Sequence, residues 1–375
     1  MRADVEQALA PVLEAAAAAA HEVDQEGTFP AAAVEALRGS GLLGLTLPRD
    51  SGGMAAAPRD FAEVVFELAQ VCGSTAMVYL MHVSASMTVA GAPVAHRPEL
   101  LEELAGGSTL ATLAFSERGS RSHFWSPVSQ AVVEGDGVRV RAEKSWVTSA
   151  AHADLFVIST RTADGEAADV DLYALPAGTA GLKVAGPWRG MGLRGNDSSP
   201  MTVDTLLTAG DRIGGPAAGF GIMMGTVLPW FNLGNAAVSL GLASGAARAA
   251  VRHCGGARFE QLDQSLADLP TIRQRLARMT VQLAAQRAYL LTVADALAAP
   301  DDQTTLHVLS VKAGANDAAL LITDDAMRVC GGAAFSQHLG VDRYFRDARA
   351  GSVMAPTADV LYDFIGKAVT GRPLF

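Results

Sequence analysis

Two short segments of the sequence bring together residue types that could hold a flat ring system. Residues 116–120 (Ser-Glu-Arg-Gly-Ser) follow the apolar run Leu110–Phe115, and residues 146–150 (Trp-Val-Thr-Ser-Ala) end another apolar run. An indole can cover one face of a ring, while nearby hydroxyl and backbone N–H groups hydrogen-bond to its polar edge. We therefore expect a planar cofactor, such as an isoalloxazine ring, to lie between the two segments. The alternative interpretation is that Trp146 fills a β-sheet core and that the hydroxyl groups cap turns.

Both segments resemble motifs of the acyl-CoA dehydrogenase family. SERGSRSHF (residues 116–124) resembles the family's T-E-P-x-A-G-S-D segment, and KSWVTSAAHAD (residues 144–154) resembles its K-x-W-I-T-N-G-x-x-A-D segment. The two occur in the family's order and at roughly its spacing. GMGLRGNDSS, from Gly190, also resembles the family's G-x-R-G-S segment. The resemblance extends from about Phe29 to Ile365 and predicts a divergent member of the family.

The fold implied by the resemblance is α+β and mainly α, with three domains. We expect an N-terminal helical domain over residues 1–107, a middle β-barrel domain over 108–213, and a C-terminal four-helix bundle over 214–375. The residue pattern agrees, because the two outer parts carry apolar residues at helical spacing and the middle part has short β-type runs separated by Gly, Asp and Ser. A chain of 375 residues also exceeds the usual ceiling for a single core.

Composition narrows the function classes further. A net charge of −10 argues against a general nucleic-acid binder. No apolar run reaches the length of a membrane span, and we expect no signal peptide and a cytoplasmic location. Cys72, Cys254 and Cys330 show no C-x-x-C pattern and are predicted to be reduced core thiols. The eight histidines show no metal-ligand spacing, so no metal is expected; His82, on an apolar helix, is interpreted as a core residue.

The resemblance implies that the cofactor is FAD, at a site shared between two subunits of a homodimer or homotetramer. Trp146 would cover one ring face, Thr148 would bond near N5, and Gly331 and Gly332 would approach the FAD of the neighbouring subunit. Arg328 stands where the family usually has Gln, and a cation there could pair with pyrophosphate. The residues predicted to contact FAD are Phe115, Ser116, Trp146, Thr148, Arg258, Arg328, Gly331, Gly332 and Thr357.

The catalytic base of the family is missing. The family removes the α-proton of an acyl thioester with the Glu of Y-E-G-T, while hydride leaves for flavin N5. Here that position is Ala355. A minority of members place the Glu in L-x-x-E-R on an earlier helix, where this chain has Phe231 and Asn232. Neither Ala nor Phe can accept a proton, so the catalytic residue is unknown.

Three accounts of the missing base remain open. A relocated base, with Glu117, His123 and Asp363 as candidates, would allow oxidoreduction of an acyl thioester bound to CoA or to a carrier protein, and this account is narrowly favoured. Alternatively, a monooxygenase or oxidase of the same fold would act on a small molecule through the reaction of reduced flavin with oxygen, which would need no carboxylate. In the third account the chain is a non-catalytic flavin-binding paralogue. A flavin reductase or an electron-transfer flavoprotein is the expected redox partner.

The segment after the first motif departs from the family in charge. Arg118, Arg121 and His123 stand where the family prefers Pro, Gly and Asp. They could form an anion site for a phosphate or a substrate carboxylate, or they could be a solvated charge cluster. The residues predicted to contact the substrate are Ser122, Arg121, His123, Phe231, Asn232 and Ala355.

Overall fold

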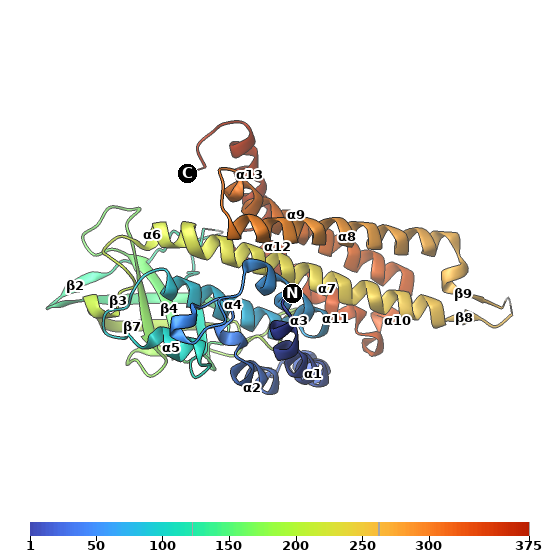
Figure 1. Ribbon diagram of the computed structural model, residues 1–375, viewed down its shortest axis with the longest axis horizontal. Coiled ribbons are helices and arrows are strands. Elements are labelled where there is room, and N and C mark those ends of the chain that lie inside the picture. The colour runs from blue at the N-terminus through green and yellow to red at the C-terminus, as the bar shows by residue number, and fades with distance from the viewer. Residues whose placement is uncertain (122, 262, 375) are drawn as a thin grey trace.

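The computed structural model describes residues 1–121, 123–261 and 263–374. The N-terminal part of the chain is a layer of helices (Figure 1). Helix α4 is buried on almost all sides because it packs against α3, α7 and strand β1 at once. Such a helix carries no polar face, since it meets no water. Five helices form this part: α1 (Ala3–Glu26), α2 (Ala31–Ser40), α3 (Pro58–Val71), α4 (Gly73–Ala90) and α5 (Leu100–Ala105).

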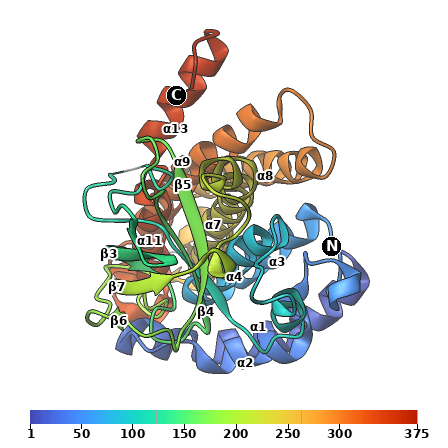
Figure 2. The ribbon, with the colours of Figure 1, turned by 90° about the vertical axis from the view of Figure 1, so that its left-hand side faces the viewer.

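The middle part consists of two sheets that share one hydrophobic core, seen from the end in Figure 2. One sheet has the order β1-β4-β5, with β1 parallel to β4, and the other has the order β2-β3-β7-β6. A bridge between Glu117 and Lys144 links the end of β1 to β3. The strands are β1 (Ala111–Ala114), β2 (Val132–Glu134), β3 (Gly137–Val147), β4 (Leu155–Arg161), β5 (Val170–Pro176), β6 (Leu182–Val184) and β7 (Ser199–Leu207).

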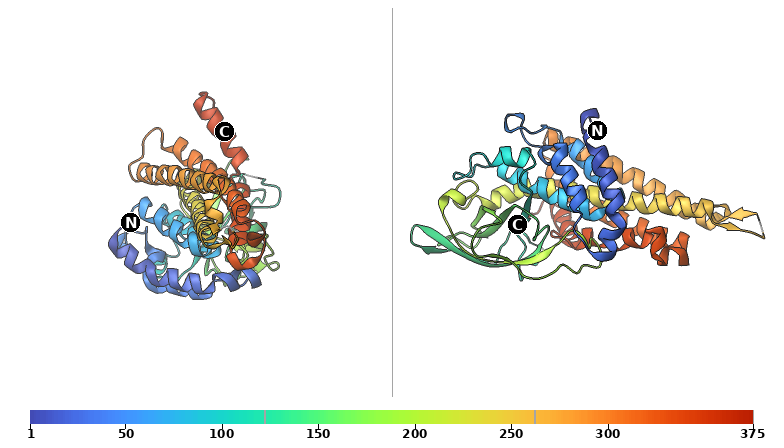
Figure 3. Two further views of the ribbon diagram at one scale, coloured as in Figure 1. Left: turned by 90° about the vertical axis from the view of Figure 1, so that its right-hand side faces the viewer. Right: turned by 90° about the horizontal axis from the view of Figure 1, so that it is seen from below.

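The C-terminal part is a bundle of long helices. A short helix, α6 (Gly219–Ile222), and a π-helical turn, η4 (Met223–Val227), lead into α7 (Leu228–Gly256). The hairpin β8–β9 (Arg258–Phe259, Gln264–Ser265) projects from the far end of α7, as Figure 3 shows. The remaining helices are α8 (Pro270–Ala298), α9 (Thr304–Cys330), α10 (Gly332–Phe335), α11 (Val341–Asp347), α12 (Arg349–Val353) and α13 (Ala358–Val369).

A polar seam joins the three parts. Arg346 of α11 donates two hydrogen bonds to the carboxylate of Asp24 on α1, at 2.8 and 2.5 Å. The neighbouring carboxylate of Asp347 accepts a hydrogen bond from the backbone N–H of Leu193 at 2.7 Å. The two contacts fix the segment around Leu193, which follows β6, against both helical parts. The predicted α+β, mainly helical fold is confirmed; its two predicted boundaries fall between α5 and β1 and between β7 and α6.

His82 is a core residue of α4, as predicted. Its Nδ1 accepts a hydrogen bond from the N–H of Ala111 at 3.0 Å, and its Nε2 donates to the carbonyl of Leu43 at 2.9 Å. Burial lowers the pKa of His82 to about 4. The neutral ring therefore locks β1 against the N-terminal helices and plays no part in the cavity described below.

Within the described ranges, no helix has the length and apolar character needed to cross a membrane. The same residues contain no group of three or more His, Cys, Asp or Glu side chains arranged to hold a metal ion. The three cysteines are buried free thiols.

Candidate active site

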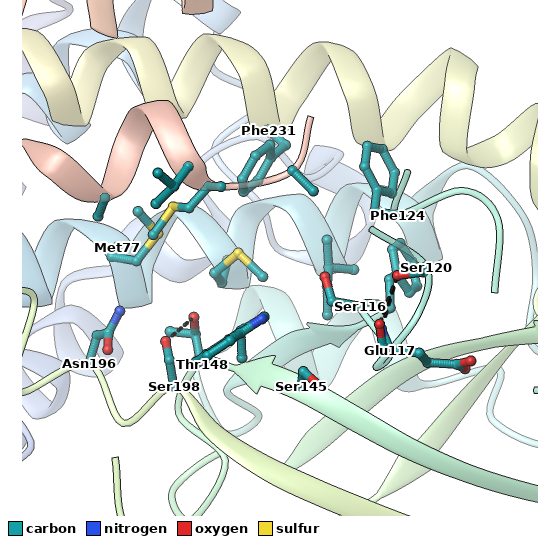
Figure 4. A pocket seen from close by; sticks show the side chains of 18 of the residues that line it. Met77, Ser116, Glu117, Ser120, Phe124, Ser145, Thr148, Asn196, Ser198 and Phe231 are labelled. Carbon is teal, nitrogen blue, oxygen red and sulfur yellow. Dashed lines mark hydrogen bonds between the residues drawn. The ribbon is translucent and has the colours of Figure 1, made fainter. Parts of the chain in front are cut away.

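A cavity of about 960 Å³ lies where the three parts meet (Figure 4). Its floor is the end of β3 with the turn that follows β1, and α4 contributes Met77 and Met81. The first turn of α7 and the segment after α12 close it from the other side with Phe231 and Ala355. Most of these side chains are apolar, so the cavity suits a ligand with a large apolar surface.

A β-bulge presents Trp146 to the cavity. The register of β3 against β7 shifts between Lys144 and Val147, and Trp146 takes a positive φ of 59°. A bulge re-aims a side chain, and here the indole is left 66% exposed beside the cavity, edge-on to Trp188 at 5.9 Å. A large aromatic face left uncovered in this way fits the flat ring of a flavin. The interpretation of Trp146 as a core plug is therefore wrong.

The hydroxyl groups predicted to face the ring are also in the cavity. Thr148 is buried and shares a hydrogen bond with Ser198 at 3.1 Å. Ser116 lines the cavity, and its carbonyl accepts the N–H of Ser145 at 2.8 Å, which joins the two predicted segments. Phe115 lines the same wall and stacks on Phe124. The structure thus brings the two motifs together around one space, and their side chains fit a flavin.

Glu117 lines the cavity, but its carboxylate is fully engaged. It accepts hydrogen bonds from the ammonium of Lys144 at 2.6 Å, the hydroxyl of Ser129 at 2.5 Å, and the N–H groups of Val128 and Ser129 at 2.7 and 2.6 Å. Burial alone would raise its pKa, but the charge of Lys144 and these donors lower the pKa below its ordinary value. Glu117 therefore anchors the turn after β1 and is unsuited to take a proton.

The other two candidates for a relocated base are not among the described residues that line the cavity. His123 packs edge-on against Trp125, and Asp363 lies on α13 in an ion pair with Lys367. Ala355 and Phe231, at the family's two base positions, do line it. Among the described lining residues, Glu117 is consequently the sole carboxylate. The structure does not support the prediction of a relocated base on any of the three residues.

A buried lysine holds the wall that carries Ala355. The ammonium of Lys312, on α9, donates to the carbonyls of Gly351 and Met354 at 3.1 Å each and of Pro356 at 2.7 Å. Its side chain has no exposed surface, and burial lowers its pKa to about 7. The segment between α12 and α13 is therefore fixed to helix α9 of the bundle through the ammonium of Lys312.

Several predicted residues lie away from the cavity in this chain. Arg258, on the β8–β9 hairpin, pairs with Asp263, and Arg328 pairs with Asp324 on α9. Gly331 and Gly332 end α9 at the same far end of the bundle (Figure 1). Thr357, at the start of α13, and the buried Asn232, which donates to the carbonyl of Val308, do not line the cavity either, and Ser122 lies outside the described residues.

Arg118 and Arg121 line the rim of the cavity. Both are exposed, and neither has a carboxylate partner within the described residues. Because Lys144 neutralises Glu117, these two guanidinium groups give the rim a positive charge in a chain whose net charge is −10. The rim is therefore complementary to an anionic group. This agrees with the interpretation of Arg118 and Arg121 as part of an anion site.

Sequence reasoning missed the residues that complete the cavity. Asn196 and Ser198 lie in the segment recognised as G-x-R-G-S but were not assigned to a site. The motif itself was the available signal, since it leads into β7 beside Trp146. Met77 and Met81 looked like ordinary core residues of an apolar helix.

Comparison with known proteins agrees with this fold and site. The chain matches three family descriptions in order: acyl-CoA dehydrogenase, N-terminal domain, over residues 2–108; middle domain, over 112–206; and C-terminal domain, over 217–370. The chain belongs to the acyl-CoA dehydrogenase family. As predicted, it is an FAD-dependent oxidoreductase, and several of its homologues are named acyl-CoA dehydrogenases, enzymes that act on CH–CH groups.

Individual relatives show how far the similarity extends. A cyclohex-1-ene-1-carbonyl-CoA dehydrogenase from Geobacter metallireducens is 29% identical over 94% of this chain and 92% of the relative. A 3-sulfinopropanoyl-CoA desulfinase from Paraburkholderia xenovorans is 28% identical over 96% and 94%. The structure of butyryl-CoA dehydrogenase from Megasphaera elsdenii superimposes with a TM-score of 0.92 at 21% identity and covers 99% of both chains.

Proposed function

We propose that the chain oxidises an acyl thioester, carried by CoA or a carrier protein, with molecular oxygen and without a carboxylate base. The observation that carries the proposal is the cavity lining, whose one described carboxylate, Glu117, is already engaged by four hydrogen-bond donors. Dehydrogenation needs a free base within reach of the α-proton. A monooxygenase or oxidase reaction of reduced flavin with oxygen does not need this base.

The residues of the cavity suit such a reaction. Bound FAD, once reduced, supplies the two electrons that convert one atom of O₂ to water while the other enters the product. Met77, Met81, Phe124 and Phe231 give the cavity apolar walls against which the acyl group of a thioester would pack. Arg118 and Arg121 at the rim attract an anionic group such as the phosphate of a pantetheine arm. A flavin reductase is the redox partner that this reaction requires.

The second candidate is dehydrogenation of an acyl thioester, favoured by relatives that are named dehydrogenases. A relative of similar identity is instead named a desulfinase, so names at this distance do not settle one reaction for the family. A site shared between two copies, in a homodimer or homotetramer, supports either reaction. It would bring Arg328 and Gly331 of one copy toward the cavity of another, which the single chain does not do.

Two mixing experiments separate the candidates. Oxidised holoprotein is mixed anaerobically with butyryl-CoA and octanoyl-CoA in D₂O, and we expect neither loss of the flavin's visible absorbance nor deuterium exchange at the α-carbon. Pre-reduced holoprotein is then mixed with the same thioesters and isotopically labelled O₂, and label should enter the product. Bleaching by a thioester without oxygen would overturn the proposal in favour of dehydrogenation.

The variant Ala355→Glu tests whether the cavity holds a thioester in the family's position. It returns a carboxylate to the wall opposite Trp146, and general-base catalysis is worth ~10²–10⁴-fold when the geometry is right. We expect bleaching by butyryl-CoA to begin in this variant. Val369→Glu is the matched control, because Val369 is largely exposed on α13 and lies outside the described cavity lining.

A further inference from the structure

Asn196 is the one buried amide on the described cavity lining whose side chain has no hydrogen bond. The residue is 1% exposed, and neither its Oδ1 nor its Nδ2 has a partner among the described residues. Figure 4 shows it at the same end of the cavity as Thr148 and Ser198, next to Met77. A donor and an acceptor without partners therefore lie in the wall of the space that a ligand would fill.

The backbone around Asn196 is held by hydrogen bonds on both sides of the residue. Its N–H donates to the carbonyl of Leu193 at 3.1 Å, and its own carbonyl accepts the N–H of Ser149 at 2.9 Å. The N–H of Gly195 donates to the hydroxyl of Ser74 at 3.2 Å. Leu193 is in turn bonded to Asp347 through the polar seam. The unpaired amide is thus carried by a backbone segment that is hydrogen-bonded to all three parts of the fold.

An unpaired buried polar group costs free energy, so a residue of this kind is expected to find its partner in a ligand. We infer that Asn196 recognises an amide-type group, a carbonyl next to an N–H, on the molecule bound in the cavity. Its Nδ2 donates to that carbonyl and its Oδ1 accepts from that N–H. In the motif G-x-R-G-S the family has Ser at this position, and a hydroxyl is shorter and cannot offer a separate donor and acceptor.

Two molecules in such a cavity carry this chemistry. The pyrimidine edge of an isoalloxazine ring has a carbonyl beside an N–H, and the pantetheine arm of a thioester contains secondary amides. The inference holds for either source and does not depend on whether the reaction is oxygenation or dehydrogenation. Separate binding measurements for the two molecules decide which one Asn196 contacts.

The variant Asn196→Leu, which keeps the size of the side chain and removes both polar atoms, is the central test. Thermal unfolding of the FAD-free chain should show no loss of stability, because two unpaired groups have been deleted. The dissociation constant for FAD, from flavin fluorescence, and that for butyryl-CoA, from the absorbance change of the FAD-loaded protein, are then measured. We expect one of the two to rise about tenfold, as for the loss of a hydrogen-bonded pair.

Asn196→Ser, which installs the residue of the family motif, serves if the Leu variant folds poorly, and the same constant should rise several-fold. Gln286→Leu is the matched control: its amide oxygen is also unpaired, but it lies on α8, outside the cavity lining. Both constants should be unchanged in that control. The inference is overturned if neither constant rises in the Asn196 variants. It is also overturned if the FAD-free Asn196→Leu chain is markedly less stable, since the amide would then have a partner within the protein.

Discussion

Two lysines without exposed surface hold two walls of the cavity, and they do so by different chemistry. Lys144 binds the carboxylate of Glu117 at 2.6 Å and the carbonyl of Ser159 at 2.6 Å, and so fixes the turn beside Ser116. Lys312 binds three carbonyls and no carboxylate, and so fixes the segment that carries Ala355. One ammonium is neutralised by a full charge, whereas the other is stabilised by dipoles alone.

The difference affects how strongly each of the two buried ammonium groups holds its proton. Burial lowers the pKa of Lys144, but the charge and hydrogen bond of Glu117 oppose this effect, and a buried ion pair is strongly destabilised when one partner is removed. A buried ammonium among carbonyls has lost its hydration without gaining an opposite charge, so its proton is held weakly. The wall beside Ser116 is therefore held by an opposite charge, whereas the wall that carries Ala355 is held by carbonyl dipoles alone.

The largest effect is expected from Lys144→Met. Glu117 would be left as a buried charge without its cation, which costs roughly 3–5 kcal/mol of unfolding free energy. Urea denaturation at neutral pH measures it. The double variant Lys144→Met, Glu117→Gln should recover much of the loss, because it removes the stranded charge. Equal stability of the single and double variants would show that the pair is not the cause.

Lys312 should make stability rise with pH above neutrality. Its folded pKa of about 7 lies below the value of 10.5 for a free lysine, so between these values the unfolded chain binds more protons than the folded one. Unfolding free energy should then increase by up to about 1.4 kcal/mol per pH unit from this group. The slope is taken as the difference between wild type and Lys312→Met from pH 7 to 9.5. No difference in slope would mean that Lys312 stays charged.

His82 is a third buried basic side chain, and it differs from the two lysines because burial keeps it neutral. Its folded pKa of about 4 lies below the ordinary value of 6.5, so the unfolded chain takes up a proton first as the pH falls. Its contribution is complete above pH 6.5 and is lost toward pH 4, by about 3 kcal/mol. The variant His82→Gln should show a flatter decline than wild type over that interval. A parallel decline would contradict the assignment.

The smallest effect on the unfolding free energy is expected from removing a solvent-exposed ion pair. Arg139 and Glu134 pair at 2.7 Å across the β2–β3 hairpin, with side chains 26% and 47% exposed. Arg139→Met should leave the unfolding free energy almost unchanged, because surface pairs contribute little. The same denaturation series as for Lys144→Met provides the measurement. A loss comparable to that of Lys144→Met would show that burial does not explain the contrast.

The fold and the flavin-facing part of the site were predictable because local motifs carry them. The segments 116–124 and 144–154 each specify a strand end with its polar turn, and their pairing follows from the family's order. Position 355 was also correctly placed at the cavity, since a motif of the C-terminal part marks it. These features depend on residues that are near one another in the sequence.

The parts that could not be predicted depend on partners far along the chain. Glu117 was a candidate base because nothing in its own segment shows that Lys144, 27 residues later, neutralises it. Lys312 reads as an ordinary helical lysine, and its carbonyl partners lie 39 to 44 residues away. Asn196 stood in a recognised motif, but its lack of partners emerges only when every neighbouring element is in place.

The polar seam has a consequence for how the protein is made. Asp24 and its partner Arg346 are separated by 322 residues. At a synthesis rate of about 5–20 residues per second, α1 waits roughly 15–65 s on the ribosome before its anchor emerges. During that time the apolar side of α1, including Val5, Leu9 and Val12, has only its neighbours in the N-terminal part for cover. A nascent chain halted before residue 346 therefore lacks the charged contact that ties its first helix to the C-terminal part.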